Sequence, residues 1–277
     1  MNNKRRLINL IAIISVLLLV ITGCSANASN SKAKKTLKIG VCAGPYGDMF
    51  AEAIQPSLEE KGYTVELVEF SDYVQPDKAL AAGEIDANMF QHSTYLKNFS
   101  TENGLDLTAI KEIPTAGMGI FSQKYKSIAE IEDGAIVAIP NDATNLSRAI
   151  RVLAQTGIIT IDPSIDPTKA TQNDLSSNPK NLQFTEIEAP QLPRSLDSVG
   201  IAVINGNYAL SAGLNLSDAL YNEKIAAGYI NVIAVRTADK DSEFAKDIVS
   251  VVESDAFKKV IEDPAKQYVS FQRPTDY

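Results

Sequence analysis

The strongest constraint on the fold is the alternation of short β-branched runs with helix-like stretches along residues 36–104. The run 36–41 (Thr-Leu-Lys-Ile-Gly-Val) predicts a strand, 49–61 predicts a helix that ends at Gly62, and 64–70 predicts a second strand. The same alternation continues with a short helix over 76–82, a strand over 85–90 and a helix over 94–103. Alternation of this kind is typical of an α/β fold with a largely parallel sheet.

A second set of elements follows the segment 114–119, which reads Pro-Thr-Ala-Gly-Met-Gly. The sequence predicts strands over 135–139 and 200–204, a helix over 144–156 and a loop-rich excursion over 161–180. A strand over 229–235 is expected to return the chain to the first lobe, with helices over 243–254 and 255–262. Two lobes joined by two crossings form a cleft. We therefore expect lobe 1 over 36–115, lobe 2 over 116–234 and a return segment of lobe 1 over 235–277.

The N-terminus has the pattern of an export signal. A basic start, Lys4–Arg6, precedes an apolar run over 7–22, which is shorter than the roughly 20 residues of a spanning helix. Small residues then precede Cys24, as in a lipobox. We expect a signal peptide over 1–23, acylation of Cys24 by fatty acids such as palmitate, and a lipidated flexible tether over 24–35. The protein would be lipid-anchored at the extracytoplasmic face of the cell membrane; the alternative is a plain secretory signal with a chance cysteine.

Charge and cysteine content narrow the class of function. The chain has 26 basic and 34 acidic side chains, and removal of three basic residues with the signal leaves a net charge near −11. Such a surface repels phosphate backbones, so we expect no nucleic-acid partner. Cys42 is the only other cysteine, so acylation of Cys24 leaves no intramolecular disulfide. We expect Cys42 to be a small buried side chain and not a reactive thiol.

The residues that enzymes commonly use are scarce. His92 is the single histidine, and the sequence has no paired Cys/His spacing and no phosphate-binding glycine loop. Carboxylate pairs such as Glu59 and Glu60 fall in segments predicted to be exposed, where a solvated face is the simpler interpretation. We therefore expect a binding protein without catalysis, cofactor or metal.

Polar and aromatic residues gather where predicted strands end, which is the usual place for ligands in α/β folds. One group is 70–73 (Phe-Ser-Asp-Tyr), and another is 86–95, which contains Phe90, His92 and Tyr95. Each aromatic side chain alone is more often part of a core. Their close spacing among amide side chains, however, suits a half-apolar pocket wall with a few hydrogen-bonding groups.

A third group runs from a predicted strand into a predicted helix over 138–148. Asp142 or Thr144 can cap that helix, and Arg148 lies about one turn inside it. An arginine can clamp a carboxylate through two parallel hydrogen bonds. Spacing alone does not separate Arg148 from Arg151, and an exposed charge is the simpler interpretation of either.

Five blocks of the sequence resemble the methionine-binding lipoprotein family, the substrate-binding component of methionine-uptake ABC transporters. The blocks are 70–80, 83–92, 139–148, 203–209 and 229–233, and they match in order within about residues 36–270. The resemblance implies a two-lobed periplasmic-binding-protein fold, type II-like, with the ligand cleft between the lobes. It also implies a monomer that binds methionine or a close analogue and delivers it to the permease of an ABC importer.

The resemblance further implies eight ligand-binding residues. Tyr73, Phe90, His92 and Tyr95 would form the wall around the thioether, and Arg148 would hold the α-carboxylate. Asn205 and Asn231, helped by Asn145, would bond to the amino and carboxylate groups. The residues alone agree with this interpretation, because an amino acid needs a cation for its carboxylate, amide oxygens for its ammonium and an apolar wall for its side chain.

Three departures from the family pattern leave the ligand open. Tyr46 stands where the family usually has histidine, Ser93-Thr94 stands where it has Gln-Pro, and Gly200 replaces an aspartate. The alternatives are another amino acid or a methionine-containing dipeptide as ligand, a sensor or adhesin without transport, and a cleft enzyme with His92 as its base.

Overall fold

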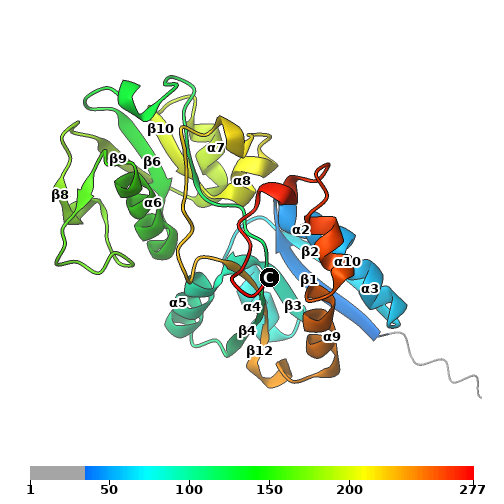
Figure 1. Ribbon diagram of the computed structural model, residues 1–277. Coiled ribbons are helices and arrows are strands. Elements are labelled where there is room, and N and C mark those ends of the chain that lie inside the picture. The colour runs from blue at the N-terminus through cyan, green and yellow to red at the C-terminus, as the bar shows by residue number, and fades with distance from the viewer. Residues whose placement is uncertain (1–34) are drawn as a thin grey trace, which may run out of the picture. The chain divides into compact units, whose positions relative to one another are not determined.

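The computed structural model of this protein describes residues 35–277, which form two five-stranded sheets, each with its own helices, and one two-stranded sheet (Figure 1). The expected signal peptide, the acylated Cys24 and the tether up to residue 34 lie outside the described residues. Within the described chain, no helix is both long enough and apolar enough to cross a membrane.

The first lobe is built on a five-stranded sheet in the order β2-β1-β3-β12-β4. Its strands are β1 (Lys35–Cys42), β2 (Tyr63–Phe70), β3 (Ala87–His92), β4 (Leu107–Glu112) and β12 (Asn231–Arg236). β1 pairs in parallel with β2 and β3, whereas β12 is antiparallel to β3 and β4. The helices are α2 (Pro45–Met49), a π-helical turn (Phe50–Ile54), α3 (Gln55–Glu60), α4 (Gln75–Ala82), α5 (Ser93–Asn103), α9 (Glu243–Val252) and α10 (Asp255–Ile261).

The second lobe is built on a sheet in the order β11-β5-β10-β6-β9. Its strands are β5 (Gly119–Phe121), β6 (Ile136–Pro140), β9 (Gln183–Ile187), β10 (Ile201–Ile204) and β11 (Tyr221–Asn222), and its helices are α6 (Ala143–Gln155), α7 (Leu192–Ser195) and α8 (Gly206–Ser211). A small antiparallel pair, β7 (Thr160–Ile161) and β8 (Leu175–Ser177), lies in the predicted loop-rich excursion. Short 3₁₀ turns of the second lobe occupy Ile128–Glu130, Gln172–Asp174, Ala189–Gln191 and Leu216–Asp218. Two further 3₁₀ turns, Thr237–Asp239 and Gln267–Ser270, follow β12 and α10 of the first lobe.

The chain returns to the first lobe earlier than the expected boundary at residue 234. β12 begins at Asn231, and its residues pair with β3 on one side and β4 on the other. Five of its six residues are fully buried, because a central strand is covered on both faces. β12 therefore belongs to the sheet of the first lobe from Asn231 onward, whereas the lobe boundary expected from sequence lies at residue 234. At the other end, Lys35 belongs to β1 and not to the tether.

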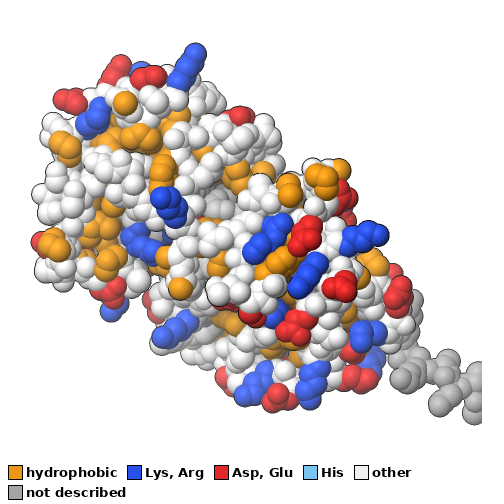
Figure 2. Space-filling view, in the orientation of Figure 1, with side chains coloured by type: hydrophobic (Ala, Val, Ile, Leu, Met, Phe, Trp, Pro, Cys, Tyr) orange, Lys and Arg blue, Asp and Glu red, His pale blue; other side chains and the backbone are white. Residues whose placement is uncertain are grey.

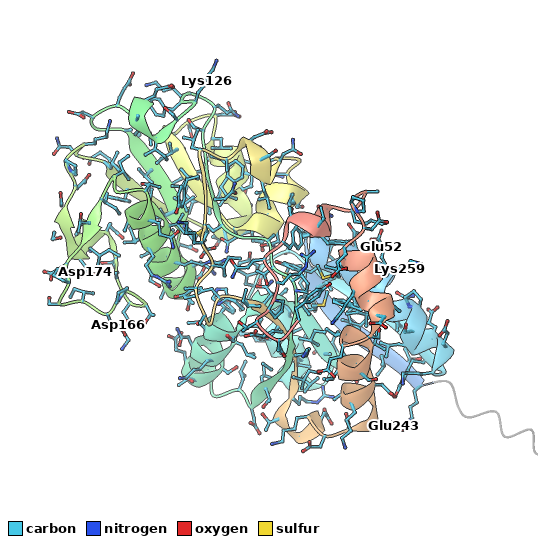
Figure 3. All side chains as sticks on the ribbon, viewed as in Figure 1. Glu52, Lys126, Asp166, Asp174, Glu243 and Lys259 are labelled. Atoms are coloured by element: carbon cyan, nitrogen blue, oxygen red, sulfur yellow. The ribbon has the colours of Figure 1, made fainter. Side chains whose placement is uncertain are left out.

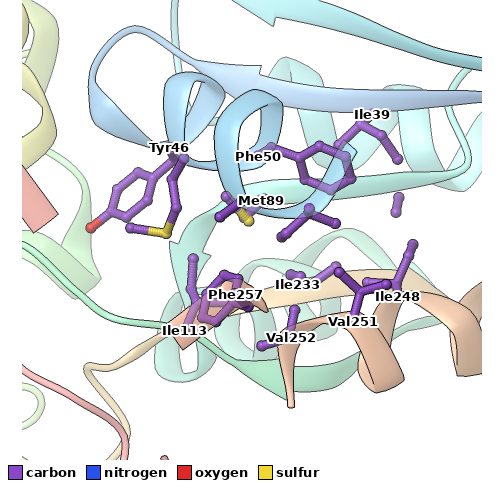
Figure 4. Close-up of a cluster of buried hydrophobic side chains, with 14 of the residues drawn as sticks. Ile39, Tyr46, Phe50, Met89, Ile113, Ile233, Ile248, Val251, Val252 and Phe257 are labelled. Atoms are coloured by element: carbon purple, nitrogen blue, oxygen red, sulfur yellow. The ribbon is translucent and has the colours of Figure 1, made fainter. Parts of the chain in front are cut away.

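The two ends of the described chain share one core. Ile39 of β1, Phe50 and Met89 pack in the same apolar cluster as Ile248 of α9 and Phe257 of α10 (Figure 4). The apolar core of the first lobe is therefore complete only when the C-terminal helices pack on a sheet that begins with the N-terminal strand β1. The second lobe has a separate cluster around the apolar face of α6.

One glycine allows the second lobe to touch the first crossing. A Cβ built on Gly206, at the start of α8, would lie 2.5 Å from the carbonyl oxygen of Gly117. A backbone atom cannot move aside as a flexible side chain can. The absence of a side chain at Gly206 therefore lets α8 approach the segment that joins the lobes.

We expect Phe257→Ala to lower the free energy of unfolding by about 3–5 kcal/mol, because a fully buried ring is replaced by a cavity. The measurement is urea denaturation followed by circular dichroism. Val269→Ala, at a side chain that is 49% exposed, is the control and should change stability by less than about 0.5 kcal/mol. A similar small effect at Phe257 would show that the C-terminal helices do not complete the core.

Candidate ligand-binding site

A narrow pocket between the two five-stranded sheets is lined by residues of both lobes. All eight residues predicted to bind a ligand line it: Tyr73, Phe90, His92, Tyr95, Asn145, Arg148, Asn205 and Asn231. The sequence analysis did not include five further lining residues: Tyr46, Gln91, Ala116, Gly206 and Asn207. The structure therefore brings every predicted side chain together.

The end of β3 carries the first-lobe wall of the pocket. His92 is the last residue of this strand and the N-cap of α5, where its Nδ1 accepts a hydrogen bond of 3.1 Å from the Tyr95 N–H. Because Nδ1 is an acceptor, the proton of the neutral ring is on Nε2, which lies 3.4 Å from Asn145 Oδ1 of the second lobe. Burial, together with the charge of Arg148, lowers the pKa of His92 well below its usual value. The imidazole is therefore neutral at pH 7 and links the two lobes.

One end of the pocket is aromatic. The Tyr73 ring stacks on Phe90 with centroids 5.7 Å apart and on Tyr208 of the second lobe at 4.9 Å, and Tyr95 meets both Tyr73 and Phe90 edge-on. The Tyr73 hydroxyl donates a 2.6 Å hydrogen bond to Asn207 Oδ1. These rings form an apolar slot whose position is fixed from both lobes.

The other end of the pocket contains a buried ion pair. Asp142 caps α6 by accepting a 2.9 Å hydrogen bond from the Asn145 N–H, and this sets Arg148 one turn into the helix. Arg148 donates from Nε to both carboxylate oxygens of Glu223, at 2.9 and 3.1 Å, and from Nη2 to Oε2 at 2.6 Å. Burial alone lowers the pKa of the guanidinium, but Glu223 raises it by more, so Arg148 remains charged. No hydrogen bond joins Arg148 Nη1 to any of the residues in 35–277.

Arg151 occupies a different position from Arg148. Its guanidinium carbon lies 4.6 Å from the centre of the Tyr229 ring, and that ring is in turn 4.8 Å from the ring of His92. Arg151 does not line the pocket. The phase of α6, which spacing alone left open, therefore places Arg148 in the pocket and Arg151 behind it.

Two asparagines line the pocket, and one of them has a polar atom without a partner. Asn205 Nδ2 donates to Asn145 Oδ1 at 2.8 Å, but Asn205 Oδ1 is buried without a hydrogen-bond partner. Asn231 Nδ2 donates to the Phe90 carbonyl at 3.1 Å. An unpartnered buried acceptor costs free energy, so Asn205 Oδ1 indicates a donor that is supplied by a ligand or by water.

Most of the pocket residues that the sequence analysis missed lie beside recognised ones. Asn207 belongs to the same Asn-Gly-Asn block as Asn205, and Gln91 lies between Phe90 and His92. Tyr46 accepts a 3.1 Å hydrogen bond from the Ala116 N–H, and burial raises its pKa to about 12. Glu223 had no such signal, because it follows the two-residue strand β11 in a segment without a motif.

The other departures from the family pattern lie outside the pocket lining. The hydroxyls of Ser93 and Thr94 both donate to the Gly228 carbonyl, at 3.0 and 2.8 Å, and thus tie α5 to the segment that precedes β12. Gly200 packs near Ala135 and Tyr125 in the second lobe. These positions shape the protein around the pocket without facing it.

Neither a reactive thiol nor a metal cluster is found among residues 35–277. The Cys42 thiol is buried, as expected, and donates to the Asp72 carbonyl at 3.1 Å. Burial raises its pKa well above the usual value, which suppresses the thiolate. In this part of the chain no three His, Cys, Asp or Glu side chains are grouped so that they could hold a metal ion.

Charge on the outer surface is of mixed sign and distant from the pocket. Figure 2 shows basic and acidic side chains interspersed over one face of the molecule. In Figure 3, exposed side chains such as Lys126, Asp166 and Asp174 lie at the outer edge of the second lobe. The Arg148–Glu223 pair is different, because the two side chains are only 5% and 2% exposed.

A buried carboxyl lies behind the pocket wall. Asp77 Oδ1 accepts hydrogen bonds from Asn88 Nδ2 at 2.8 Å and from Gln91 Nε2 at 2.5 Å, whereas Oδ2 is buried without a partner. Burial raises the pKa of Asp77 to about 6, although the two hydrogen bonds act in the opposite direction. Asp77 therefore fixes the position of Gln91, and the free-energy cost of burying its carboxyl group depends on pH.

The pH dependence of stability tests this assignment. An unfolded aspartate titrates near pH ~3.9, so the contribution of Asp77 is fully present below about pH 4 and is lost as the pH rises through about 6. The stability of the wild type relative to Asp77→Asn, which cannot titrate, should fall by about 2 kcal/mol between about pH 4 and pH 7. Urea denaturation at several pH values measures this difference, and a constant difference would contradict the raised pKa.

This chain is similar to known proteins over most of its length. The model of the NlpA lipoprotein family matches residues 37–271. The D-methionine-binding lipoprotein MetQ of Escherichia coli K12 is 39% identical over 240 residues, which cover 86% of this chain and 87% of that protein. A solved nutrient-binding protein from Burkholderia cenocepacia, described as bound to methionine, is 37% identical with a TM-score of 0.77, covering 82% of this chain and 95% of its own.

A solved ABC transporter periplasmic substrate-binding protein from Coxiella burnetii is similar as well. It is 39% identical with a TM-score of 0.76, and the match covers 82% of this chain and 95% of that one. The predicted two-lobed α/β fold is thereby confirmed. By sequence and by structure, this chain belongs to the NlpA lipoprotein family.

Proposed function

We propose that this protein binds methionine as a zwitterion in the pocket between its lobes and delivers it to the permease of an ABC importer. The observation that carries the proposal is that a single pocket combines the buried guanidinium of Arg148, an unpartnered amide oxygen and an aromatic slot. These are the three chemistries that a free amino acid with an apolar side chain requires. The methionine described in the Burkholderia cenocepacia structure supports this class of ligand.

The polar end of the pocket suits the two charged groups of an amino acid. Arg148 Nη1 can donate to the carboxylate while Nε and Nη2 remain on Glu223. Asn205 Oδ1 can accept from the ammonium, and this would satisfy a buried acceptor that has no partner within the protein. Neutral His92 does not repel the ammonium. Asn145 and Asn231 hold the surrounding groups in place through the hydrogen bonds described above.

The aromatic end of the pocket suits a thioether. Tyr73, Phe90 and Tyr95 present ring faces and edges, and a sulfur atom near an aromatic ring gains about 0.3–1.5 kcal/mol. A charged side chain would lose its hydration here without gaining an ionic partner. The same slot also accommodates other unbranched apolar side chains, so the selectivity for methionine is a measurable quantity.

Binding fits the site better than catalysis does. His92 is the simplest candidate for a catalytic base. However, one of its ring nitrogens accepts a backbone hydrogen bond and the other faces an amide oxygen. A lowered pKa also makes it a weak base. We therefore propose a monomeric transport component that uses the closure of two lobes to hold its ligand.

The N-terminal sequence is the basis for a proposed location at the outer surface of the cell membrane. We propose that residues 1–23 are removed as a signal peptide, that Cys24 is acylated, and that the following residues up to 34 form the tether. Acyl chains gain about 0.8 kcal/mol per buried CH₂, so several chains on Cys24 would hold the protein at the extracytoplasmic surface of the membrane.

Methionine should stabilise the folded protein, because only the native state assembles the pocket from both lobes. At a hundredfold excess over the dissociation constant, the gain is about 2.7 kcal/mol, or roughly 5–10 °C in melting temperature. The experiment is calorimetric titration and thermal melting of ligand-stripped protein with all amino acids and several methionyl peptides.

Two ligands in this panel serve as matched controls. Norleucine replaces the sulfur by a methylene, so it should bind more weakly than methionine by up to about tenfold. Lysine has a chain of similar length with a charged end and should not bind measurably. A response to a different solute, with none to methionine, would retain the fold but reject the proposed ligand.

Cys24→Ala should release the protein from membranes, because the acylated side chain is lost. The wild type and the variant are compared by membrane fractionation after a salt wash. Recovery of the variant in the washed membrane fraction would mean that another feature anchors the protein.

A further inference from the structure

We infer that Glu223 is a positioning residue for ligand recognition: it fixes the guanidinium of Arg148 so that the Nη1 end meets the ligand carboxylate. The inference rests on the proposed function, because it assigns a role to Glu223 in binding an amino acid. Glu223 does not line the pocket, and it acts through Arg148.

The geometry of the pair leaves only one end of the guanidinium free. Glu223 occupies Nε and one hydrogen of Nη2, with hydrogen bonds between 2.6 and 3.1 Å. These contacts hold the planar guanidinium in one orientation and leave Nη1 available to the pocket. Without this partner, the arginine side chain would rotate about several bonds. It would then lose side-chain entropy when it becomes ordered on a ligand.

Glu223 itself is held by the segment that joins the two lobes. Its Oε2 accepts a 2.9 Å hydrogen bond from the Met118 N–H, and its own N–H donates to the Met118 carbonyl at 2.9 Å. Met118 comes directly before β5, where the chain enters the second lobe. The carboxylate is therefore anchored to the crossing between the lobes as well as to α6.

Glu223 also balances the charge of Arg148 at the pocket. Arg148 and Glu223 cancel each other, and burial keeps His92 neutral. The pocket then takes a ligand of zero net charge without an excess buried charge. A zwitterionic amino acid with an uncharged side chain meets this condition.

A double-mutant cycle on methionine affinity tests the inference. We measure dissociation constants by calorimetry for the wild type, Glu223→Gln, Arg148→Lys and the double variant. Glu223→Gln should weaken methionine binding by about tenfold or more in the wild-type background. In the Arg148→Lys background, where the planar guanidinium is absent, the same change should alter affinity by less than about threefold.

Two further variants make the result decisive. Glu223→Asp keeps the charge but shortens the side chain, so it should recover part of the affinity and remains informative if Glu223→Gln does not fold. Glu132→Gln, which breaks an exposed ion pair with Lys124 in the same lobe, should leave affinity unchanged. Folding of every variant is checked by circular dichroism without ligand.

Equal losses from Glu223→Gln in both backgrounds, or no loss in the wild-type background, would overturn the positioning role. The wild-type titration tests the proposed function separately. If another solute binds and methionine does not, the cycle is run with that solute, and Glu223 is judged on the same criterion.

Discussion

The site depends on one buried ion pair, between Arg148 and Glu223. A guanidinium removed from water is tolerated only if a partner and good hydrogen-bond geometry compensate for its lost hydration. That partner is on the segment after β11, far from α6 along the chain, and is held by the backbone of Met118. The pair therefore forms only when three segments are correctly placed relative to one another. These are the N-terminus of α6, the strand that ends near Glu223 and the first crossing between the lobes. Loss of either member would leave the other buried and unpaired.

The lobes are also joined across the aromatic end of the pocket. Tyr73 donates to Asn207, and the same amide donates to the Ala43 carbonyl at 3.0 Å. The next residue, Gly44, has a φ of 122°, and a Cβ there would lie 2.6 Å from the Asn207 carbonyl oxygen. Residues of both lobes therefore form both ends of the pocket.

The fold was largely predictable from sequence because its signals are local. Strand and helix periods alternate clearly in the first lobe, and glycines mark the ends of α4 and α5 with left-handed backbone. The lobe boundary near residue 234 was harder to place from sequence, because the position of β12 depends on its pairing with β3 and β4, which lie far away in the chain. The helix phase that separates Arg148 from Arg151 also needed tertiary structure.

The candidate site was predictable where its residues lie in recognisable blocks. All eight carried-over positions line one pocket, and Asn207 belonged to a block that was already identified. Glu223 was missed for a physical reason, since a carboxylate in an irregular segment has no periodicity or motif, and its partner is 75 residues away along the chain. Sequence analysis thus located side chains that line the pocket but not the carboxylate that supports Arg148.

The most direct test of this account is a crystal structure of the ligand-stripped protein after methionine is added. The account predicts the ligand carboxylate within about 3 Å of Arg148 Nη1, the ammonium near Asn205 Oδ1, and Arg148 still paired with Glu223. A ligand whose carboxylate displaced Glu223 from Arg148, or lay among the rings of Tyr73 and Phe90, would contradict it.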